Sequence, residues 1–504
     1  MSGKQVLKIS LLAIVAVALI WAIPLARLAT GGLRTPAQVP APNYWPTDGW
    51  QSSTPEEQGF DSAKLAAGIQ SLQEKGIGAD SLTIIRNGYV VLDAHFAPYD
   101  GTFPHDLASV TKSVTTTLIG IAVDQGKLSL DAPMVSFFPN RTIANLDARK
   151  ARITVRHLAS MRNGMESGCF EGDEPTLQAM RANPDWVQAA LDRPMVSEPG
   201  TKFCYDSPGM HLLSAILQEA TGMTALDFAR QNLFEPLGIR DVIWDSDPQG
   251  YSRGWGDLHM LPEDAAKIGF LWLHRGQWDS QQIVSEDWVL NSVKAHSKFI
   301  EPDFGYGYGW WITDKDYQAS GRGGQRVRVM ASLNLIVVAT GSDFDYSAVE
   351  AWLTPMLIQM KDSRPANPEG LAALENTLTA IQQDSPDWTA NDTPDTAGRV
   401  SGKTYSCESN PAGIDTARLD FDGYDQAMLS AKIDGSDMAW PIGLSGSYHL
   451  APDGTALRGY WEDANTFHFE EFDLGLLTRQ VVFNGDILQI SLPEVDLTVT
   501  CQAQ

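Results

Sequence analysis

Two pairs of short apolar runs predict antiparallel strands in the first two thirds of the chain. Residues 81–86 and 89–92 are rich in β-branched and aliphatic side chains, and Asn87-Gly88 separates them. Asn-Gly between such runs is a strong signal for a two-residue hairpin turn. A second pair of runs, 325–330 and 335–339, lies late in this region. We therefore expect an early hairpin and a late strand pair.

The stretch between these strands has a helical pattern. Residues 113–123 are apolar enough to form a buried helix, and further helical segments follow to about residue 290, separated by Pro and Gly clusters. Strands at both ends with helices between them indicate one antiparallel sheet that is closed by distant segments and packed against a large helical region. The predicted fold class is α+β.

The C-terminal part has a different pattern. Residues 370–383 predict one helix, and residues 384–399, rich in Asp, Thr and Pro, predict a linker. From Gly402 onward, short runs such as 427–433 and 487–491 are separated by Gly and Asp turns. This pattern is typical of a small antiparallel β-barrel or sandwich.

The N-terminus has the features of a targeting segment. Lys4 and Lys8 precede an uncharged, largely apolar run over residues 9–26, which is the order of a signal sequence. The run is near the lower limit for crossing a bilayer, and no clean cleavage site follows it. We favour a signal anchor over a cleaved signal peptide in residues 1–30, with a Pro-rich spacer in residues 31–50. The predicted protein is exported, periplasmic and anchored to the inner membrane.

Composition and charge narrow the function class. The 504 residues carry a formal net charge of −25 and are 43% hydrophobic. This length exceeds one compact domain, and the acidity argues against nucleic acid, whose phosphates need a basic surface. Cys169, Cys204, Cys407 and Cys501 permit two disulfides in an exported chain. We expect pairing within the middle and within the C-terminal region; two separate buried thiols at Cys169 and Cys204 are the alternative.

Ser109-Val110-Thr111-Lys112 is a candidate catalytic motif. Residues three apart lie on one face of a helix, so the Ser109 hydroxyl and the Lys112 amine are held together. We expect burial to lower the pKa of the Lys112 amine, which lets it take the serine proton and create a nucleophile. Such a tetrad also arises by chance, and a capping Ser beside a solvated Lys is the alternative.

Two further segments carry candidate chemistry. Tyr205 precedes an apolar helix, where its hydroxyl can face a cleft and relay a proton beside a cationic Lys; a core tyrosine is the alternative. Gly321-Arg322-Gly323-Gly324-Gln325 opens the late strand pair. Glycines there let a ligand or another backbone approach, and an exposed N–H can bind an oxyanion. A Gly-rich turn without function is the alternative.

Taken in order, three segments resemble the motifs of the serine β-lactamase-like hydrolases. They are Ser109-Val110-Thr111-Lys112, Tyr205-Asp206-Ser207 and Arg322-Gly323-Gly324. This group includes class C β-lactamases, D-aminopeptidases, esterases and 6-aminohexanoate-dimer hydrolases. The resemblance covers about residues 50–360, and the C-terminal segment is similar to lipocalin-like barrels. It implies a β-lactamase-like domain over 51–362, a helix and linker over 363–400, and a C-terminal β-domain over 401–504.

The resemblance also implies roles for individual residues. Ser109 would attack a carbonyl, and Lys112 and Tyr205 would share the base role. Backbone N–H groups of Ser109 and Gln325 would stabilise the oxyanion. Apart from the resemblance, the position of Cys204 next to Tyr205 leads to the hypothesis that a Cys169–Cys204 bridge pins Tyr205 against the loop at 165–174, a candidate pocket wall.

The second and third motifs depart from the family pattern. Ser207 stands where Asn is commoner, so its shorter hydroxyl would contact Lys112 or substrate differently. Arg322 stands where Lys or His is usual, beside Gly323 and Gly324 of the substrate strand. Arginine keeps the positive charge and can bind a carboxylate through two hydrogen bonds, but it cannot donate a catalytic proton. We therefore expect a carboxylate-bearing substrate.

The sequence predicts a serine hydrolase that cleaves an ester or amide through acyl-Ser109. The alternatives are a D-amino-acid peptidase or β-lactamase acting on cell-wall peptides or β-lactams, and a non-catalytic peptidoglycan- or partner-binding protein with this fold. Gly-x-Ser-x-Gly, HExxH, CxxC and Walker motifs are absent from the sequence, so we expect no metal and no cofactor. The expected partner is a small ester, amide or peptide, and the oligomeric state is open.

Overall fold

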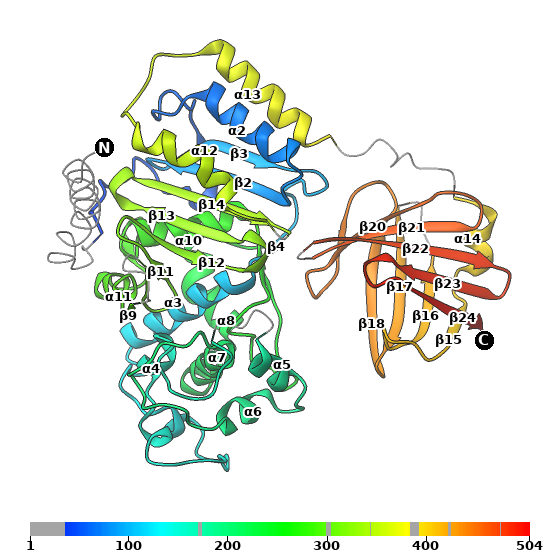
Figure 1. The fold of residues 1–504 in the computed structure, drawn as a ribbon, viewed down its shortest axis with the longest axis horizontal. Coiled ribbons are helices and arrows are strands. Elements are labelled where there is room, and N and C mark those ends of the chain that lie inside the picture. Colours follow the sequence, from blue (N-terminus) through cyan, green and yellow to red (C-terminus); the bar gives the residue numbers. More distant parts are fainter. Residues whose placement is uncertain are drawn as a thin grey trace, which may run out of the picture.

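The computed structural model describes residues 36–169, 174–298, 304–342, 344–383, 393–421, 425–473 and 475–504. Within them, the chain forms a larger α+β domain and a β-barrel (Figure 1). The signal anchor predicted for residues 1–30 and the first part of the predicted spacer lie outside the described residues. No helix within the described ranges is long and apolar enough to cross a membrane.

One mixed sheet forms the centre of the larger domain. Its described strands are β1 (Gln51–Ser52), β2 (Ala79–Arg86), β3 (Tyr89–His95), β9 (Ser297–Lys298), β10 (Gly305–Tyr306), β11 (Trp311–Ile312), β12 (Tyr317–Ser320), β13 (Arg326–Met330) and β14 (Leu335–Gly341). Their order is β1-β3-β2-β14-β13-β12-β11-β10-β9. The β1–β3 pair is parallel, and the remaining pairs between these strands are antiparallel.

Both predicted strand pairs are confirmed. Asn87 and Gly88 turn β2 into β3 with φ of 53° and 85°, the positive values that a tight hairpin turn needs. Asn334, with φ of 49°, precedes β14. Strand β14 pairs with both β2 and β13, as Val337 opposite Ile84 and Ile336 opposite Val329 show. Segments some 250 residues apart in sequence therefore lie side by side, as the sequence predicted.

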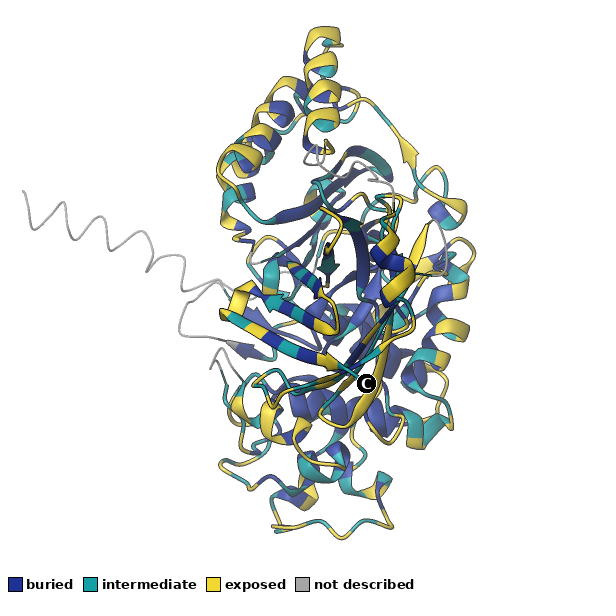
Figure 2. Ribbon diagram, turned by 90° about the vertical axis from the view of Figure 1, so that its right-hand side faces the viewer, coloured by how far each residue is buried: buried dark blue, intermediate teal, exposed yellow. Residues whose placement is uncertain are grey.

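Helices cover both faces of this sheet (Figure 1). On one face lie α2 (Ser62–Glu74), α12 (Ser347–Ile358) and α13 (Pro368–Ile381), the last being the helix predicted at 370–383. On the other lie α3 (Thr111–Asp124) and α10 (Pro262–Leu273). Buried residues gather in the sheet and in the helices that flank it (Figure 2).

A helical region extends from α3 and supports the start of that helix. It contains α4 (Val155–Ala159), α5 (Pro175–Arg181), α6 (Trp186–Asp192), α7 (Ser207–Thr221), α8 (Ala225–Ala229), α9 (Glu235–Leu237) and α11 (Glu286–Ser292). Helix α7 is buried from Ser207 to Leu217 and packs against α3. A small sheet, β4 (His105–Asp106), β6 (Leu258–Met260) and β5 (Ile243–Trp244), leads into α3. The strand pair β7 (Gln277–Trp278) and β8 (Gln281–Gln282) follows α10.

The C-terminal region is a closed antiparallel barrel, as predicted. After α14 (Asp395–Val400), its strands are β15 (Thr404–Cys407), β16 (Ile414–Asp420), β17 (Gln426–Ile433), β18 (Ser436–Gly443), β19 (His449–Leu450), β20 (Ala456–Trp461), β21 (Thr466–Phe472), β22 (Leu476–Asn484), β23 (Ile487–Leu492) and β24 (Leu497–Ala503). A parallel contact of Gly443 with Arg458 closes the ring between β18 and β20. Cys407 in β15 is bonded to Cys501 in β24, directly opposite in the register.

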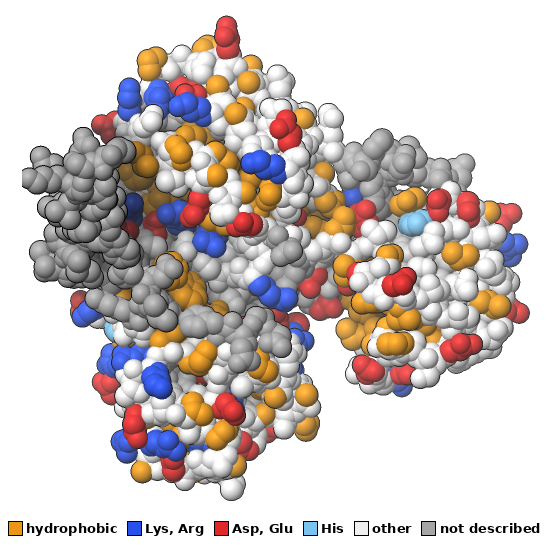
Figure 3. Space-filling model, in the orientation of Figure 1, with side chains coloured by type: hydrophobic (Ala, Val, Ile, Leu, Met, Phe, Trp, Pro, Cys, Tyr) orange, Lys and Arg blue, Asp and Glu red, His pale blue; other side chains and the backbone are white. Residues whose placement is uncertain are grey.

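An aromatic seam joins the barrel to the larger domain. Tyr99 and Phe103 pack with Ala456 and Phe472 of the barrel, and the Tyr99 and Phe472 rings stack with centroids 5.6 Å apart. Figure 3 shows the barrel as a separate lobe beside the larger domain. The barrel strands β20 and β21 thereby lie against the segment that leads into β4.

Candidate active site

Ser109 and Lys112 meet at the start of helix α3. Ser109 lies in a 3₁₀ turn, Ala108–Val110, that leads into the helix. The Lys112 Nζ atom donates hydrogen bonds to Ser109 Oγ at 2.7 Å and to the Trp255 carbonyl at 2.8 Å. Lys112 is only 1% exposed, so its amine is withdrawn from water and directed at the serine hydroxyl.

The backbone just before Ser109 is strained. Ala108 has φ of 44°, a left-handed conformation that is costly for a residue with a Cβ. Its N–H donates to Asp106 Oδ1 at 2.7 Å, and the Thr111 hydroxyl donates to its carbonyl at 2.6 Å. These two hydrogen bonds hold the turn that presents the Ser109 side chain to the cavity.

Tyr205 lies over the same lysine. Lys112 Nζ is 4.8 Å from the centroid of the Tyr205 ring. The Trp311 ring stacks on the Tyr205 ring, with the two ring centroids 5.8 Å apart and an interplanar angle of 16°. The Ser167 hydroxyl donates to the Tyr205 carbonyl at 2.6 Å. The structure therefore brings together Ser109, Lys112 and Tyr205.

Asp206 fixes the second motif from within the core. Its carboxylate accepts hydrogen bonds from Arg193 at 2.6 Å and from the Asn163 amide at 2.6 Å, and it is 1% exposed. The next residue, Ser207, begins α7 and is fully buried, and its hydroxyl has no hydrogen-bond partner among the described residues. The expected contact of this hydroxyl with Lys112 is not seen among the described residues, and Ser207 is not part of the cavity lining.

The third motif depends on its glycines. A Cβ on Gly321 would lie 2.7 Å from the Leu107 carbonyl oxygen and 3.0 Å from the Ala108 Cβ, so only glycine lets β12 approach the turn that carries Ser109. Gly323 and Gly324 have φ of 77° and 99°, values that favour glycine. Arg322, which precedes these two glycines, is exposed and lines the cavity.

The side-chain amide of Gln325 holds this residue in place through two hydrogen bonds to the backbone of Gly341. The Gln325 amide donates to the Gly341 carbonyl at 2.7 Å and accepts from the Gly341 N–H at 3.0 Å. Its carbonyl accepts from the Gly321 N–H at 2.8 Å, and the residue is fully buried. Both bonds to Gly341 tie the start of β13 to β14. The sequence singled out the backbone of Gln325, but the role of its side chain as a rigid clamp went unpredicted.

Ser109, Tyr205 and Arg322 line a cavity of about 520 Å³, whereas the predicted site residues Lys112, Ser207, Gly323, Gly324 and Gln325 are not part of its lining. Its lining comprises Ser109, Glu174, Tyr205, Phe304, Trp311, Gln318, Ser320, Gly321, Arg322, Arg326 and Glu350. Arg326, which the sequence analysis did not single out, also lines the cavity. Its guanidinium lies 4.3 Å from the Tyr346 ring centroid and donates a hydrogen bond to Gln318 at 3.1 Å. Burial lowers the pKa of Arg326. The volume suits a small organic molecule.

A disulfide braces one wall of this cavity. Cys169 is bonded to Cys204, the residue before Tyr205, which is the pairing within the middle region that the sequence favoured. The Cys204 N–H also donates to the Met161 carbonyl at 3.0 Å. Two disulfides are typical of an extracellular or periplasmic protein.

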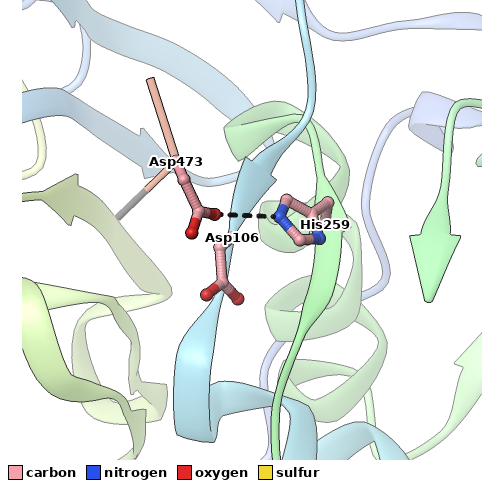
Figure 4. A group of neighbouring side chains, drawn as sticks. All are labelled: Asp106, His259 and Asp473. Carbon is pink, nitrogen blue, oxygen red and sulfur yellow. Dashed lines mark hydrogen bonds and ion pairs between the residues drawn. The ribbon is translucent and has the colours of Figure 1, made fainter. Parts of the chain in front are cut away.

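Asp106, His259 and Asp473 form a cluster where the barrel meets the larger domain (Figure 4). Each offers one nitrogen or oxygen atom, and these atoms all lie within 4.8 Å of one another. Burial opposes the charge on His259, but its hydrogen bond to Asp473 and the charges of Asp106, Asp473 and Asp257 outweigh burial and raise its pKa to about 9. Burial raises the pKa of Asp106 to about 6. Within the cluster, His259 forms an ion pair with Asp473. Sequence reasoning missed the cluster because its members come from three distant segments.

The larger domain matches a known family. A family model described as Beta-lactamase matches residues 65–353. This range is more than half of the chain, so the chain belongs to the Beta-lactamase family, and its fold is β-lactamase-like with a C-terminal barrel.

Several characterised proteins are similar to parts of this chain. Lovastatin esterase of Penicillium rubens is 30% identical over 152 residues, which are 27% of this chain and 38% of that protein. 6-Aminohexanoate-dimer hydrolase of Paenarthrobacter ureafaciens is 22% identical over 290 residues, 52% of this chain and 72% of that protein. Penicillin-binding protein 4 of Amycolatopsis lactamdurans is 30% identical over 170 residues, 34% of this chain and 39% of that protein. The similarity to the first and third spans well under half of their length.

Solved structures share the fold. A Bacillus anthracis protein proposed to be a 6-aminohexanoate-dimer hydrolase superimposes with a TM-score of 0.53 and 16% identity, covering 65% of this chain and 89% of that one. EstCE1, a hydrolase with promiscuous acyltransferase activity, gives a TM-score of 0.50 and 17% identity, covering 58% of this chain and 98% of that one. Identities at this level show the fold alone.

Proposed function

We propose that this protein is a serine hydrolase that cleaves an ester or amide bond through an acyl-Ser109 intermediate. The observation that carries the proposal is the 2.7 Å hydrogen bond between Lys112 Nζ and Ser109 Oγ, made by a lysine that is only 1% exposed. Membership of the Beta-lactamase family and the esterase and hydrolase names among similar proteins support it.

In the proposed reaction, Ser109 Oγ attacks the substrate carbonyl carbon and its proton passes to the Lys112 amine. Tyr205, whose ring faces Lys112, shares this base role. The N–H groups of Ser109 and Gln325 stabilise the oxyanion. The bond to the leaving alcohol or amine then breaks as that group takes the proton. Water attacks the acyl-Ser109 ester, which releases the acid and restores the Ser109 hydroxyl.

We propose a carboxylate-bearing substrate. Arg322 and Arg326 both line the cavity, and Arg326 Nε has no hydrogen-bond partner among the described residues. A guanidinium binds a carboxylate through paired, charge-assisted hydrogen bonds. Arg322→Ala should raise KM for esters of dicarboxylic acids about tenfold and leave KM for neutral p-nitrophenyl esters unchanged, with Arg322→Lys as the matched control. An equal effect on both ester classes would show that Arg322 does not bind the substrate carboxylate.

A D-amino-acid peptidase or β-lactamase is the second candidate, favoured by the similarity to penicillin-binding protein 4. A non-catalytic peptidoglycan- or partner-binding protein is the third, favoured by the departures at Ser207 and Arg322 from the family motifs. The two disulfides support an exported location for each candidate.

One experiment separates these candidates. Wild type and Ser109→Ala are incubated with a fluorophosphonate probe, and both are assayed on p-nitrophenyl esters, a cephalosporin and D-Ala peptides. We expect labelling and ester turnover in the wild type and neither in Ser109→Ala. Turnover confined to the cephalosporin or the D-Ala peptides would favour the second candidate. Absence of labelling and of all turnover in the wild type would favour the third.

A further inference from the structure

The cluster of Asp106, His259 and Asp473 combines side chains from both domains (Figure 4). Asp106 in β4 and His259 in β6 lie opposite each other in the register of the small sheet, and both are buried. Asp473 directly follows β21 of the barrel, and its side chain is 49% exposed. Two paired strands of the larger domain thus present a carboxylate and an imidazole to a carboxylate of the barrel that solvent can reach.

The contact between His259 and Asp473 is long for a direct hydrogen bond. N–H···O hydrogen bonds are mostly about 2.7–3.2 Å long, and the buried pair His211–Asp247 of this protein is at 3.0 Å. His259 Nε2 and Asp473 Oδ1 are 3.4 Å apart. Two ligands of one tetrahedral zinc ion, with bonds of about 2.0–2.2 Å, are also separated by about 3.4 Å. The spacing therefore suits two ligands of a shared ion.

Gly454 of the barrel leaves space beside the same nitrogen. Its φ of 96° favours glycine, and a Cβ at this position would lie 2.6 Å from His259 Nε2. Any side chain here would therefore press on the nitrogen that faces Asp473. The barrel approaches the imidazole without covering that nitrogen with a side chain.

The two carboxylates of the cluster face a single imidazole. Burial raises the pKa of Asp106 against the opposite effect of His259, and the charge of Asp473 adds to the rise. The charge of Arg322 also reaches Asp473, but among the described residues no lysine or arginine forms an ion pair with either carboxylate. Buried carboxylates are ordinarily paired with a cation or bound to a metal. A divalent cation would supply the positive charge that the cluster lacks.

We propose that Asp106, His259 and Asp473 bind one zinc ion, which joins the barrel to the larger domain. Zinc takes tetrahedral sets of nitrogen and oxygen ligands, often three from the protein and one water. Mg²⁺ and Ca²⁺ take about six or more ligands, nearly all oxygen, which this cluster does not offer. The ligand atoms lie within 4.8 Å of one another, so small side-chain rotations would complete the set.

The sequence gave no sign of this site, because the expectation of no metal rested on motif spacing and the three ligands lie in distant segments. None of the three lines the cavity at Ser109, so the inference is independent of the proposed hydrolase function. In the metal-free protein, the ion pair of His259 with Asp473 remains.

Zinc binding to the full-length protein without a polyhistidine tag tests this inference. The protein is freed of metal with EDTA, dialysed and titrated with ZnCl₂ in a calorimeter. We expect one tightly bound zinc ion per chain and a thermal midpoint that rises with the zinc concentration. MgCl₂ at the same concentrations should leave the midpoint unchanged. Absence of a rise with zinc, or an equal rise with Mg²⁺, would overturn the proposal.

Single substitutions locate the site. Asp473→Ala and His259→Gln each remove one ligand and should weaken zinc binding at least about tenfold. Asp437→Ala and His449→Gln remove the same kinds of group from β18 and β19 of the barrel and should bind zinc as the wild type does. Equal zinc affinity in Asp473→Ala and the wild type would place the ion elsewhere and overturn the proposal.

Two further measurements keep the test decisive. If His259→Gln fails to fold, Asp473→Ala decides alone, because its side chain is half exposed. Co²⁺ bound in place of zinc should give the visible absorption of a tetrahedral ion in the wild type and lose it in Asp473→Ala; an octahedral spectrum in the wild type would overturn the proposal. Ser109→Ala should bind zinc as the wild type does. Loss of zinc binding in Ser109→Ala would place the ion at the hydrolase cavity and overturn the proposal, whatever the outcome for catalysis.

Discussion

The Nε2 atom of His259 lies 3.4 Å from Oδ1 of Asp473, across the boundary between the two domains and across 214 positions of sequence. His259 belongs to β6, the strand that pairs with β4, where His259 lies opposite Asp106. Asp106 in turn accepts the Ala108 N–H next to Ser109. The barrel is thus connected to the turn that carries Ser109 through three side chains and one backbone group.

The ion pair between His259 and Asp473 should make the stability of the fold decrease as the pH becomes alkaline. The pKa of His259 is raised from its ordinary 6.5 to about 9 in the folded protein, so the stabilisation is complete below pH 6.5 and is lost as the pH rises through about 9. Asp106, with a pKa of about 6, titrates below this window. We expect the thermal midpoint to fall between pH 6.5 and 9.5 at constant ionic strength.

Asp473→Asn is the matching variant. It keeps the shape of the side chain and removes the charge that faces His259, so the decline with pH should become shallower. The loss at pH 7 should be about 1 kcal/mol, because Asp473 is half exposed. An unchanged slope between pH 6.5 and 9.5 would exclude this pair as the cause.

Lys112→Met separates chemistry from packing. Methionine retains an apolar side chain of similar length but removes the amine that faces Ser109 Oγ. We expect kcat to fall by about 10²- to 10⁴-fold, the range for a lost general base, while the thermal midpoint changes little. Steady-state kinetics and calorimetry check both parts, and a retained kcat would assign the base role elsewhere.

Gly321→Ala should damage activity through the backbone. The new Cβ would press on the Leu107 carbonyl at 2.7 Å and on Ala108 at 3.0 Å, which displaces the turn that carries Ser109. We expect kcat/KM to fall at least about tenfold. Gly398→Ala is the control: its Cβ meets nothing within 4 Å in α14, and alanine there should be neutral or stabilise the helix by about 0.5–1 kcal/mol.

The two disulfides should have different effects when removed. Replacing Cys407 and Cys501 by Ser releases a loop closed over 94 positions and should destabilise the barrel by about 4–5 kcal/mol in the loop-entropy model. Replacing Cys169 and Cys204 frees the segment next to Tyr205 and should lower kcat more than stability. Unfolding in denaturant and ester hydrolysis, measured on both double variants, distinguish these outcomes.

Local chemistry made the strands and their turns predictable. Asn87-Gly88 and Asn334 adopt the positive φ values that their turns require, and the alternating run at 427–433 became β17, Gln426–Ile433. The Ser109–Lys112 contact was also predictable, because residues three apart share a helix face. Each of these signals lies within a few residues of sequence.

The sequence by itself determined the elements, the order of the three motifs and the pairing of cysteines within each region. Only the tertiary structure decided the lock of Gln325 on Gly341, the place of Arg326 in the cavity wall, and the link from Asp473 through His259 to Asp106. The physical reason is the distance along the sequence between the residues that interact. Hairpin turns and helix faces are set by neighbouring residues, whereas hydrogen bonds and ion pairs between distant segments exist only once packing of the sheet, the helices and the barrel has brought them together.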